Sequence, residues 1–124
     1  MYFNGISCID ERRCWVTADG PVDGYIYHTA DGGETWNEQF KVLAGSLIDV
    51  KILPSGEGWA VGGYFYTNTF DSVFLHTTNG GETWTEANTI TNAYPNAIAV
   101  PSSERAYSTA FLRNGLSSIL GYQQ

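Results

Sequence analysis

TADGGETW at residues 29–36 returns as TTNGGETW at residues 77–84, so one eight-residue pattern occurs twice in a chain of 124 residues. The likeness extends outward on both sides. YIYHTADGGETWNE from Tyr25 aligns with VFLHTTNGGETWTE from Val73 at an offset of 48 residues. Upstream, CWVTADG from Cys14 aligns with GWAVGGY from Gly58 at an offset of 44, so the second copy holds four additional residues between these anchors. Self-similarity at a fixed period is typical of a repeat architecture.

A third copy of the unit begins near the carboxyl end. RAYSTAF places Tyr107 at the position of Trp59, 48 residues later, and SSILGYQQ resembles the DSVFLHTT segment of the second copy. The chain therefore holds about two and two-thirds units. A unit of 40–50 residues built from short strands is typical of a propeller blade, which is a four-stranded antiparallel sheet. We expect one partial propeller domain over residues 1–124, with blades at about 5–41, 47–91 and 96–124.

The pattern within one unit predicts an all-β fold. In the second copy, LIDVKILP, GWAVGGYF, SVFLHTT and TWTEANTI are alternating or rich in β-forming residues. Gly, Pro, Asn or Asp bounds each of them, as at turns. Helical periodicity is missing along the chain.

The eight-residue pattern resembles the Asp-box, S/T-x-D/N-x-G-x-T-W, also called the bacterial neuraminidase repeat. The matching positions are Thr29, Asp31, Gly33, Thr35 and Trp36 in the first copy and Thr77, Asn79, Gly81, Thr83 and Trp84 in the second. The longer pattern, GWAVGG followed by HTTNGGETW, is similar to the propeller repeats of photosystem II stability and assembly factors and of related exported proteins. The resemblance covers residues 6 to about 110. It implies a non-catalytic scaffold for protein–protein interaction that serves the assembly or stabilisation of a larger complex such as a photosystem.

The residue types of the repeated stretch favour architecture over chemistry. The paired glycines allow a tight reversal, since they adopt positive φ without steric cost. The oxygen of Asp31 or Asn79 can accept hydrogen bonds from the amides of its own loop. Asn retains the acceptor but cannot act as a general acid or base. Trp36 and Trp84 are expected to pack at the blade edge, each burying on the order of 150–250 Å².

Two enzyme classes also carry Asp-box propellers, and their residue requirements are not met convincingly. A sialidase needs an arginine cluster, whereas the arginines of this chain all lie at or near predicted turns. They are Arg12, Arg13, Arg105 and Arg113. A glycoside hydrolase needs paired carboxylates, yet turns account for most candidates, which are Asp10, Asp19, Asp23, Asp49 and Asp71. Asp49 interrupts an apolar strand and is expected to face solvent at a channel mouth. We expect no enzyme and no catalytic residue.

The histidines do not indicate a metal-binding site, and the sequence contains no nucleotide-binding motif. His28 and His76 occupy the same repeat position immediately before each box, which favours a packing or hydrogen-bonding role repeated in each blade. No phosphate-cradling loop or nucleotide fingerprint is present in the sequence. We expect no metal site and no cofactor.

The two cysteines, Cys8 and Cys14, flank the five-residue stretch IDERR. If this stretch reverses the chain, a cross-strand disulfide can form. Two free buried thiols are the alternative. A disulfide would indicate an exported, oxidising compartment, which is the thylakoid lumen, the periplasm or the extracellular space.

Charge and hydropathy exclude two classes of partner. Six basic residues against 13 acidic ones give a net charge of −7, which would repel a phosphate backbone. No apolar run approaches the roughly 20 residues of a membrane span. We therefore expect neither nucleic-acid binding nor a membrane span.

The additional residues of the second unit form a candidate interaction surface. GGYFYTNTFDS at residues 62–72 carries Tyr64, Phe65, Tyr66 and Phe70. Aromatic loops on a rigid scaffold are typical contact surfaces. The alternative is that these rings simply cover the sheet. The counterpart in the first unit, TADGPVDGY from Thr17, is acidic.

An incomplete set of blades leaves open sheet faces that something must cover. We expect a protein partner: further blades of a longer chain, copies of this chain, or a larger complex. An extracellular carbohydrate-binding or glycoside-hydrolase fragment is the alternative function.

Overall fold

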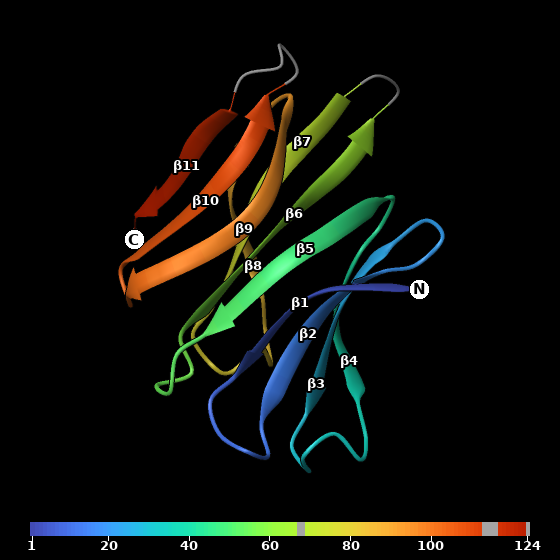
Figure 1. The fold of residues 1–124 in the computed structure, drawn as a ribbon, viewed down its shortest axis with the longest axis vertical. Coiled ribbons are helices and arrows are strands. Elements are labelled where there is room, and N and C mark those ends of the chain that lie inside the picture. Colours follow the sequence, from blue (N-terminus) through green and yellow to red (C-terminus); the bar gives the residue numbers. More distant parts are fainter. Residues whose placement is uncertain (67–68, 113–116, 124) are drawn as a thin grey trace.

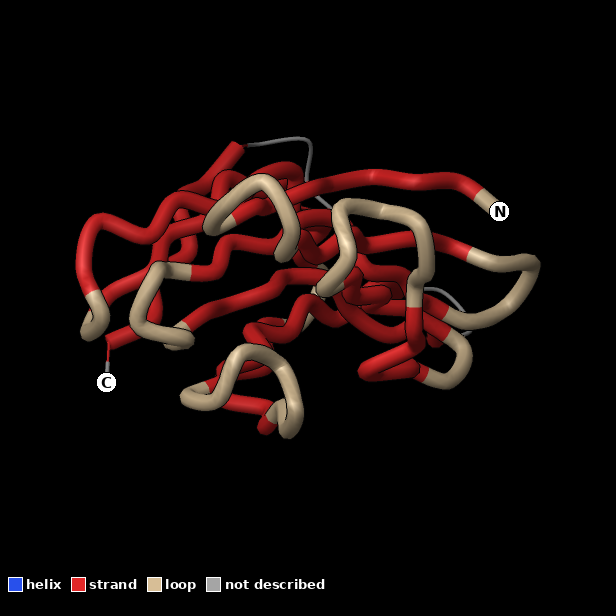
Figure 2. The backbone as a smooth tube through the Cα atoms, turned by 90° about the horizontal axis from the view of Figure 1, so that it is seen from below, coloured by secondary structure: helices blue, strands red, loops and turns tan. Residues whose placement is uncertain are grey.

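The computed structural model describes residues 1–66, 69–112 and 117–123. Within these residues the backbone forms strands and loops and contains no helix (Figure 2). The all-β class predicted from the repeat is confirmed.

The strands form three antiparallel sheets in chain order (Figure 1). Sheet 1 contains β1 (Tyr2–Cys8), β2 (Cys14–Asp19), β3 (Gly24–Thr29) and β4 (Asn37–Val42). Sheet 2 contains β5 (Gly45–Ile52), β6 (Gly58–Tyr66), β7 (Thr69–Thr77) and β8 (Thr85–Ile90). Sheet 3 contains β9 (Ala93–Ser102), β10 (Arg105–Leu112) and β11 (Ser117–Gln123). In each sheet the spatial order follows the sequence, and consecutive strands pair antiparallel.

Sheet 2 is buried on both faces because it lies between the other two. Its strands alternate their side chains between two cores, as the period of a strand requires. On β6, Ala60 belongs to the core shared with Trp15 of sheet 1, whereas its neighbours Trp59 and Val61 belong to the core shared with Ala110 of sheet 3. Each core is thus assembled from residues far apart in the sequence.

The same pairing occurs in sheets 1 and 2. Trp15 lies opposite His28 across β2 and β3, and Trp59 lies opposite His76 across β6 and β7. In sheet 3, Tyr107 takes the tryptophan position. The repeat seen in the sequence is therefore also a repeat of strand register.

Side-chain hydrogen bonds join the first strands of successive sheets. The Ser7 hydroxyl accepts from the Ile52 amide at 3.0 Å, which links β1 to β5. Asp49 Oδ2 accepts from the Ile98 amide at 3.0 Å, which links β5 to β9. Asp49 is half-buried and holds the next sheet. This role differs from the solvent-facing position expected for it.

A second repeated device secures the connection between sheets. Asp23 Oδ1 accepts from the amide of Ala44 at 2.9 Å, and Asp71 Oδ1 accepts from the amide of Asn92 at 3.2 Å. Both amide donors have left-handed backbones, with φ of 50° and 58°. An Asp just before the third strand in sheet 1, or near its beginning in sheet 2, thus accepts a hydrogen bond from the turn that leads into the next sheet.

The four additional residues of the second unit lengthen one hairpin. β6 and β7 are each nine residues long, whereas β2 and β3 are each six. The longer hairpin carries Phe65 and Phe70 near its end, whereas Tyr64 still packs against the core between sheets 1 and 2.

Candidate interaction surface

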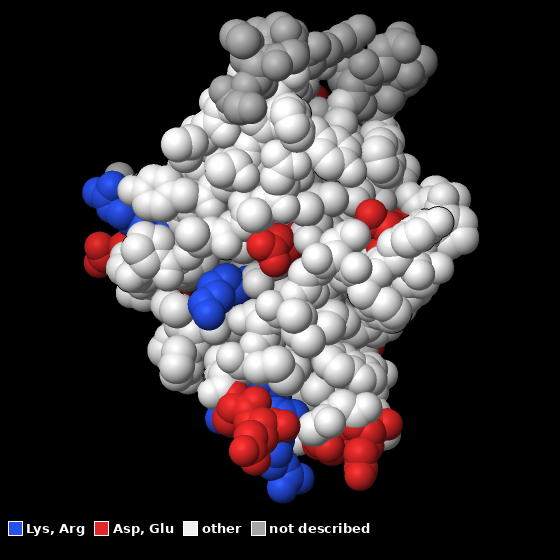
Figure 3. Space-filling model, in the orientation of Figure 1, with Lys and Arg blue, Asp and Glu red and all other residues white. Residues whose placement is uncertain are grey.

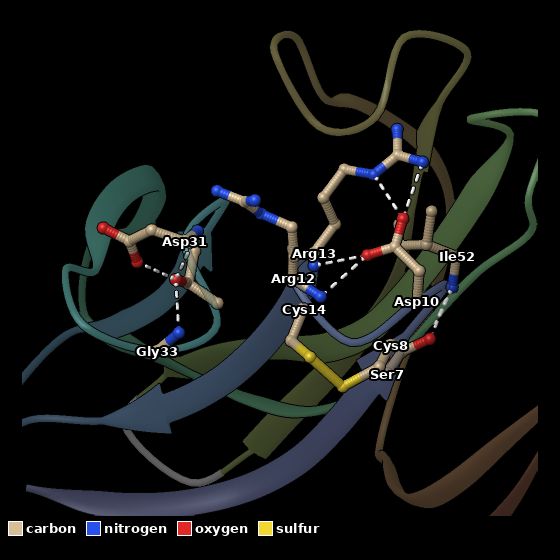
Figure 4. The surroundings of a disulfide bond; sticks show 10 residues. Ser7, Cys8, Asp10, Arg12, Arg13, Cys14, Asp31, Gly33 and Ile52 are labelled. Atoms are coloured by element: carbon tan, nitrogen blue, oxygen red, sulfur yellow. Dashed lines mark hydrogen bonds and ion pairs between the residues drawn. A yellow bond between two sulfur atoms is a disulfide. The ribbon is translucent and has the colours of Figure 1, made fainter.

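The first repeated turn is held by a network of side-chain hydrogen bonds centred on Asp31. The Thr29 hydroxyl donates to Asp31 Oδ1 at 2.8 Å and accepts from the Gly33 amide at 2.9 Å (Figure 4). Asp31 Oδ1 also accepts from the Thr35 amide at 2.9 Å, and Oδ2 accepts from the Thr35 hydroxyl at 2.5 Å. The network closes the loop on itself.

The second turn repeats this network without the charge. The Thr77 hydroxyl donates to Asn79 Oδ1 at 2.9 Å, and that oxygen accepts from the Thr83 amide at 3.0 Å. The last bond is reversed, because the Asn79 amide nitrogen donates to the Thr83 hydroxyl at 2.9 Å. A neutral acceptor therefore serves the same turn.

Hydrogen bonds to the carboxylate form lower the pKa of Asp31 to about 2. The largest contribution is the bond from the Thr35 hydroxyl, followed by the Thr35 amide and the Thr29 hydroxyl. The group stays ionised at physiological pH and accepts hydrogen bonds from its own loop. This arrangement fits a structural anchor.

The two box tryptophans differ in burial. Trp84 is 8% exposed and lies in the core between sheets 1 and 2, whereas Trp36 is 40% exposed. Trp36 therefore packs less completely than Trp84. The reason is that sheet 1 lies on one side of Trp84, while no described sheet lies on the corresponding side of Trp36.

A disulfide closes the hairpin between β1 and β2. Cys8 and Cys14 are directly opposed across the ladder, and their sulfur atoms are bonded (Figure 4). The alternative of two free thiols is wrong. Within the hairpin, Asp10 accepts from the amides of Arg12 and Arg13 at 2.9 and 2.8 Å, and the backbone bond from Arg12 is the main cause of its lowered pKa. The Gly32 amide of the box donates to Arg12 O at 3.0 Å, so hairpin and box form one corner.

Both histidines pack against tryptophans. The ring centroids of Trp15 and His28 are 4.7 Å apart, as are those of Trp59 and His76. Nε2 of His76 also lies 2.8 Å from Oε2 of Glu57. Burial lowers the pKa of His28. The histidine that precedes each repeated turn therefore makes the same contact with a tryptophan in sheets 1 and 2.

The candidate carboxylates are all engaged with the protein's own backbone or turns. In addition to Asp10, Asp23, Asp49 and Asp71, Asp19 accepts from the Ser46 hydroxyl at 2.7 Å and from the Leu47 amide at 3.0 Å. Among the arginines, Arg13 pairs with Asp10 and Arg105 donates to the Tyr107 hydroxyl. Arg113 lies outside the described residues. These acidic and basic groups come from separate strands and turns, and their partners are groups of the protein itself.

The described residues hold neither a cluster of metal ligands nor a membrane-spanning helix. In the described part of the chain, no group of three or more His, Cys, Asp or Glu side chains could hold a metal ion. Nor does any described helix have the length and apolar character to cross a membrane.

An aromatic cluster lies at the end of the long hairpin. The rings of Phe65 and Phe70 meet edge to face with centroids 5.1 Å apart, and Phe70 lies 4.7 Å from Tyr94 of β9. Phe111 of β10 is directly opposite Tyr94 in the ladder. Residues opposed in this way have Cβ atoms about 4.5–5.5 Å apart. We name Phe65, Phe70, Tyr94 and Phe111 the aromatic cluster.

The aromatic cluster is open to solvent, with Phe65 52% and Phe111 56% exposed. The strand ends that carry it lie together at the upper end of Figure 1. On the face shown in Figure 3, many of the charged side chains gather at the opposite end, near the turns β1–β2 and β3–β4. An exposed aromatic surface thus lies away from these charged turns.

The structure brings together only part of the predicted surface. Phe65 and Phe70 are in contact, but Tyr64 is half-buried and packs against the core between sheets 1 and 2. The side chain of Tyr66 lies outside the described part of the chain. Sequence reasoning missed Tyr94 and Phe111, which sit in the third unit. Their only signal is aromatic character, and their proximity depends on strand pairing.

Comparison with known proteins establishes the fold. No protein-family model and no curated protein matches the chain. Among solved structures, the chain is similar to YCF48 in a structure described as "YCF48 bound to D1 peptide", with a TM-score of 0.70 and 24% sequence identity. The similarity covers 99% of this chain, which spans only 37% of that chain. With its three antiparallel sheets in blade order, this chain is a partial β-propeller.

Proposed function

We propose that this chain is a non-catalytic β-propeller scaffold that binds a protein segment through the aromatic cluster. The observation that carries the proposal is a group of four adjacent aromatic side chains from two different sheets, of which Phe65, Tyr94 and Phe111 are exposed and Phe70 is half-buried. Sheets 2 and 3 share a buried core, so the rings are mounted on a rigid base. Such rings supply large contact area at low entropic cost and are typical of binding hot spots.

The proposal extends to the two repeated turns, the domain and the setting. The turns are Asp-boxes with a structural role, and residues 1–124 form a single partial propeller domain. The disulfide supports folding in an oxidising, exported compartment. The resemblance to photosystem II assembly factors supports a role in the assembly or stabilisation of a photosystem-like complex.

A peptide is the kind of partner that the comparison supports. In the similar structure, YCF48 is bound to a D1 peptide. Edge and face contacts with aromatic rings suit apolar and aromatic side chains of a peptide. The carbohydrate-active alternative is not favoured, because the candidate carboxylates accept hydrogen bonds from the protein itself.

The test compares peptide binding by the original chain and by a variant of the aromatic cluster. Peptides selected from a displayed random library, together with the D1 peptide, are titrated against the original chain and against the double variant Phe65→Ala, Phe111→Ala. Both residues are exposed, so the fold should survive. We expect the dissociation constant to rise at least about tenfold, as for loss of a hot spot.

The matched control is Leu43→Ala, which removes an exposed apolar side chain in the turn after β4. This variant should bind as the original chain does. If the selected peptides bind the double variant unchanged, or if the control weakens binding equally, the aromatic cluster is not the binding surface.

A further inference from the structure

Sheet 1 carries an exposed apolar face on the side away from sheet 2. We name it the first outer face; its residues are Phe3, Ile6, Val16, Tyr25, Tyr27 and Trp36. Phe3, Val16, Tyr27 and Trp36, with Met1, line a hollow of about 390 Å³. Ile6 is 64% exposed, and the rings of Tyr25 and Tyr27 stack with centroids 5.7 Å apart. A contiguous apolar surface of this kind marks an interaction site.

Each residue of the first outer face aligns, in the sequence repeat, with a residue of sheet 2. These sheet 2 residues are the ones that pack against sheet 1. The offsets are those of the sequence repeat, 44 residues for the first two strands and 48 for the rest of the unit. The matching residues are Leu47, Val50, Ala60, Val73, Leu75 and Trp84. All six are buried in the core between sheets 1 and 2. The first outer face is therefore built like a face that already receives a sheet in this molecule.

Sheet 3 presents the opposite half of such a contact. We name Tyr107, Thr109 and Ile119 the second outer face; they line a second hollow. By strand register, Tyr107 corresponds to Trp15 and Trp59. Tyr107 is 38% exposed, whereas both tryptophans are fully buried.

Ile119 of the second outer face shows the same contrast. It lies opposite Thr109, as Ile26 lies opposite Thr17 and Phe74 opposite Val61. Ile119 is 73% exposed, whereas Ile26 and Phe74 are buried. Tyr107 and Ile119 of sheet 3 are thus exposed, whereas the equivalent residues of sheets 1 and 2 are buried against the next sheet.

A contact between the second and first outer faces would also allow a hydrogen bond equivalent to the one between Trp15 and Gly80. Between sheets 1 and 2, the indole Nε1 of Trp15 donates to the carbonyl oxygen of Gly80 at 2.9 Å. The residue matching Gly80 in sheet 1 is Gly32, in the box beside the first outer face. Tyr107 accepts from Arg105 at 3.4 Å, so its hydroxyl proton remains able to donate to a carbonyl.

We propose that the second outer face of one copy of this chain packs on the first outer face of a second copy. One chain carries both halves of a contact that the structure already contains between sheets 1 and 2. Two copies joined head to tail, twice, form a closed ring of six sheets, which lies within the usual range for propellers. This inference rests on the matching positions of sheets 1 and 2 and not on the proposed peptide-binding function, although Phe111 of the aromatic cluster lies on the same face of β10 as Tyr107 and Thr109.

Sedimentation analysis over a range of protein concentrations tests the proposal. We expect the original chain to reach twice its monomer mass of 13.6 kDa and to stop there. Ile6→Glu and Ile119→Lys each place a charge in both contacts of the ring, which should raise the dissociation constant about tenfold or more. Leu43→Glu is the control, because Leu43 is similarly exposed but lies on neither face.

Mixing the two variants makes the test specific to head-to-tail packing. A mixed pair has one contact with two original faces and a second contact in which the introduced acid meets the introduced base. We expect mixing to restore the pair that neither variant forms alone. Circular dichroism checks that each variant is folded, and each face has its own substitution, so either variant alone still tests the contact.

Three results would overturn the proposal. The original chain could remain monomeric at every concentration, which would show that a second copy does not cover the two faces. It could grow beyond the pair, which would exclude a closed ring. Ile6→Glu could disrupt the pair while Ile119→Lys leaves it intact. This outcome would indicate that the first outer faces of the two copies pack against each other.

Discussion

At the scale of single residues, comparison of the two repeated turns shows which property of Asp31 and Asn79 the turn requires. Asp31 and Asn79 hold their loops with the same donors at nearly the same distances. Only the bond to the last threonine changes direction, because an amide donates where a carboxylate accepts. The turn needs one acceptor oxygen, and the charge is dispensable.

Replacement of Asp31 by Asn should therefore leave the melting temperature at pH 7 almost unchanged but remove a pH dependence. The folded pKa of Asp31 is about 2, below its ordinary value of 3.8. Such a group stabilises the folded state above pH 4, and the contribution is lost as the pH falls towards 2. Melting temperatures of Asp31→Asn measured from pH 7 to pH 2 should fall less steeply than those of the original chain.

The reciprocal substitution is the control for this effect. Asn79→Asp gives the second box the carboxylate of the first, so it should steepen the loss of stability below pH 4. If Asp31→Asn and the original chain lose stability in parallel between pH 4 and pH 2, the hydrogen bonds to Asp31 do not favour its ionised form.

At the scale of elements, the corner formed by the β1–β2 hairpin and the first box is closed in two ways. The disulfide joins the strand ends, and the Gly32 amide ties the box to the hairpin. In sheet 2 the corresponding corner has no cysteines, yet the Gly80 amide donates to Gly56 O at 2.9 Å in the same manner. The backbone bond is thus common to both corners, and the covalent bond is an addition in sheet 1.

Removal of the disulfide should weaken sheet 1 without changing its fold. The double variant Cys8→Ser, Cys14→Ser loses a cross-link that closes a short loop, which stabilises by about 2 kcal/mol in the chain-entropy description. Urea unfolding, followed by tryptophan fluorescence, should show a lower midpoint and an unchanged slope. Reduction of the original chain should reproduce the shift. An unchanged midpoint in both experiments would show that the hairpin and box hold the corner without the disulfide.

Most of the elements could be predicted because each depends on local sequence and on the repeat. Alternation and turn residues indicate the strands, and the repeated offset indicates that the sheets are equivalent. The aromatic cluster could be predicted only in part. Phe65 and Phe70 share one hairpin, whereas Tyr94 and Phe111 join them through the pairing of β9 with β10. That pairing depends on bulges and on packing between sheets, which local sequence does not specify.

At the scale of the whole molecule, burial depends on the position of a sheet in the stack. Trp36 and Trp84 match in sequence, and so do Trp59 and Tyr107, yet one member of each pair is buried and the other is partly exposed. Sequence repetition predicts the same local structure at both positions. It cannot predict burial, because burial depends on whether a neighbouring sheet is present.

The central position of sheet 2 leads to a prediction about cooperativity. Leu75 and Phe74 are neighbours on β7, but Leu75 faces the core with sheet 1 and Phe74 faces the core with sheet 3. Both are buried, so Leu75→Ala should cost about 2–5 kcal/mol and Phe74→Ala about 3–5 kcal/mol. Because both cores share sheet 2, either loss should lower the stability of all three sheets together.

Hydrogen exchange of backbone amides under native conditions measures this directly, sheet by sheet. Leu75→Ala should speed exchange in the central strands of sheet 3 as well as of sheet 1, and Phe74→Ala should do the converse. The exposed control Leu43→Ala should change neither. If each substitution affects only the sheet that its side chain faces, the blades unfold as independent neighbours and sheet 2 does not couple them.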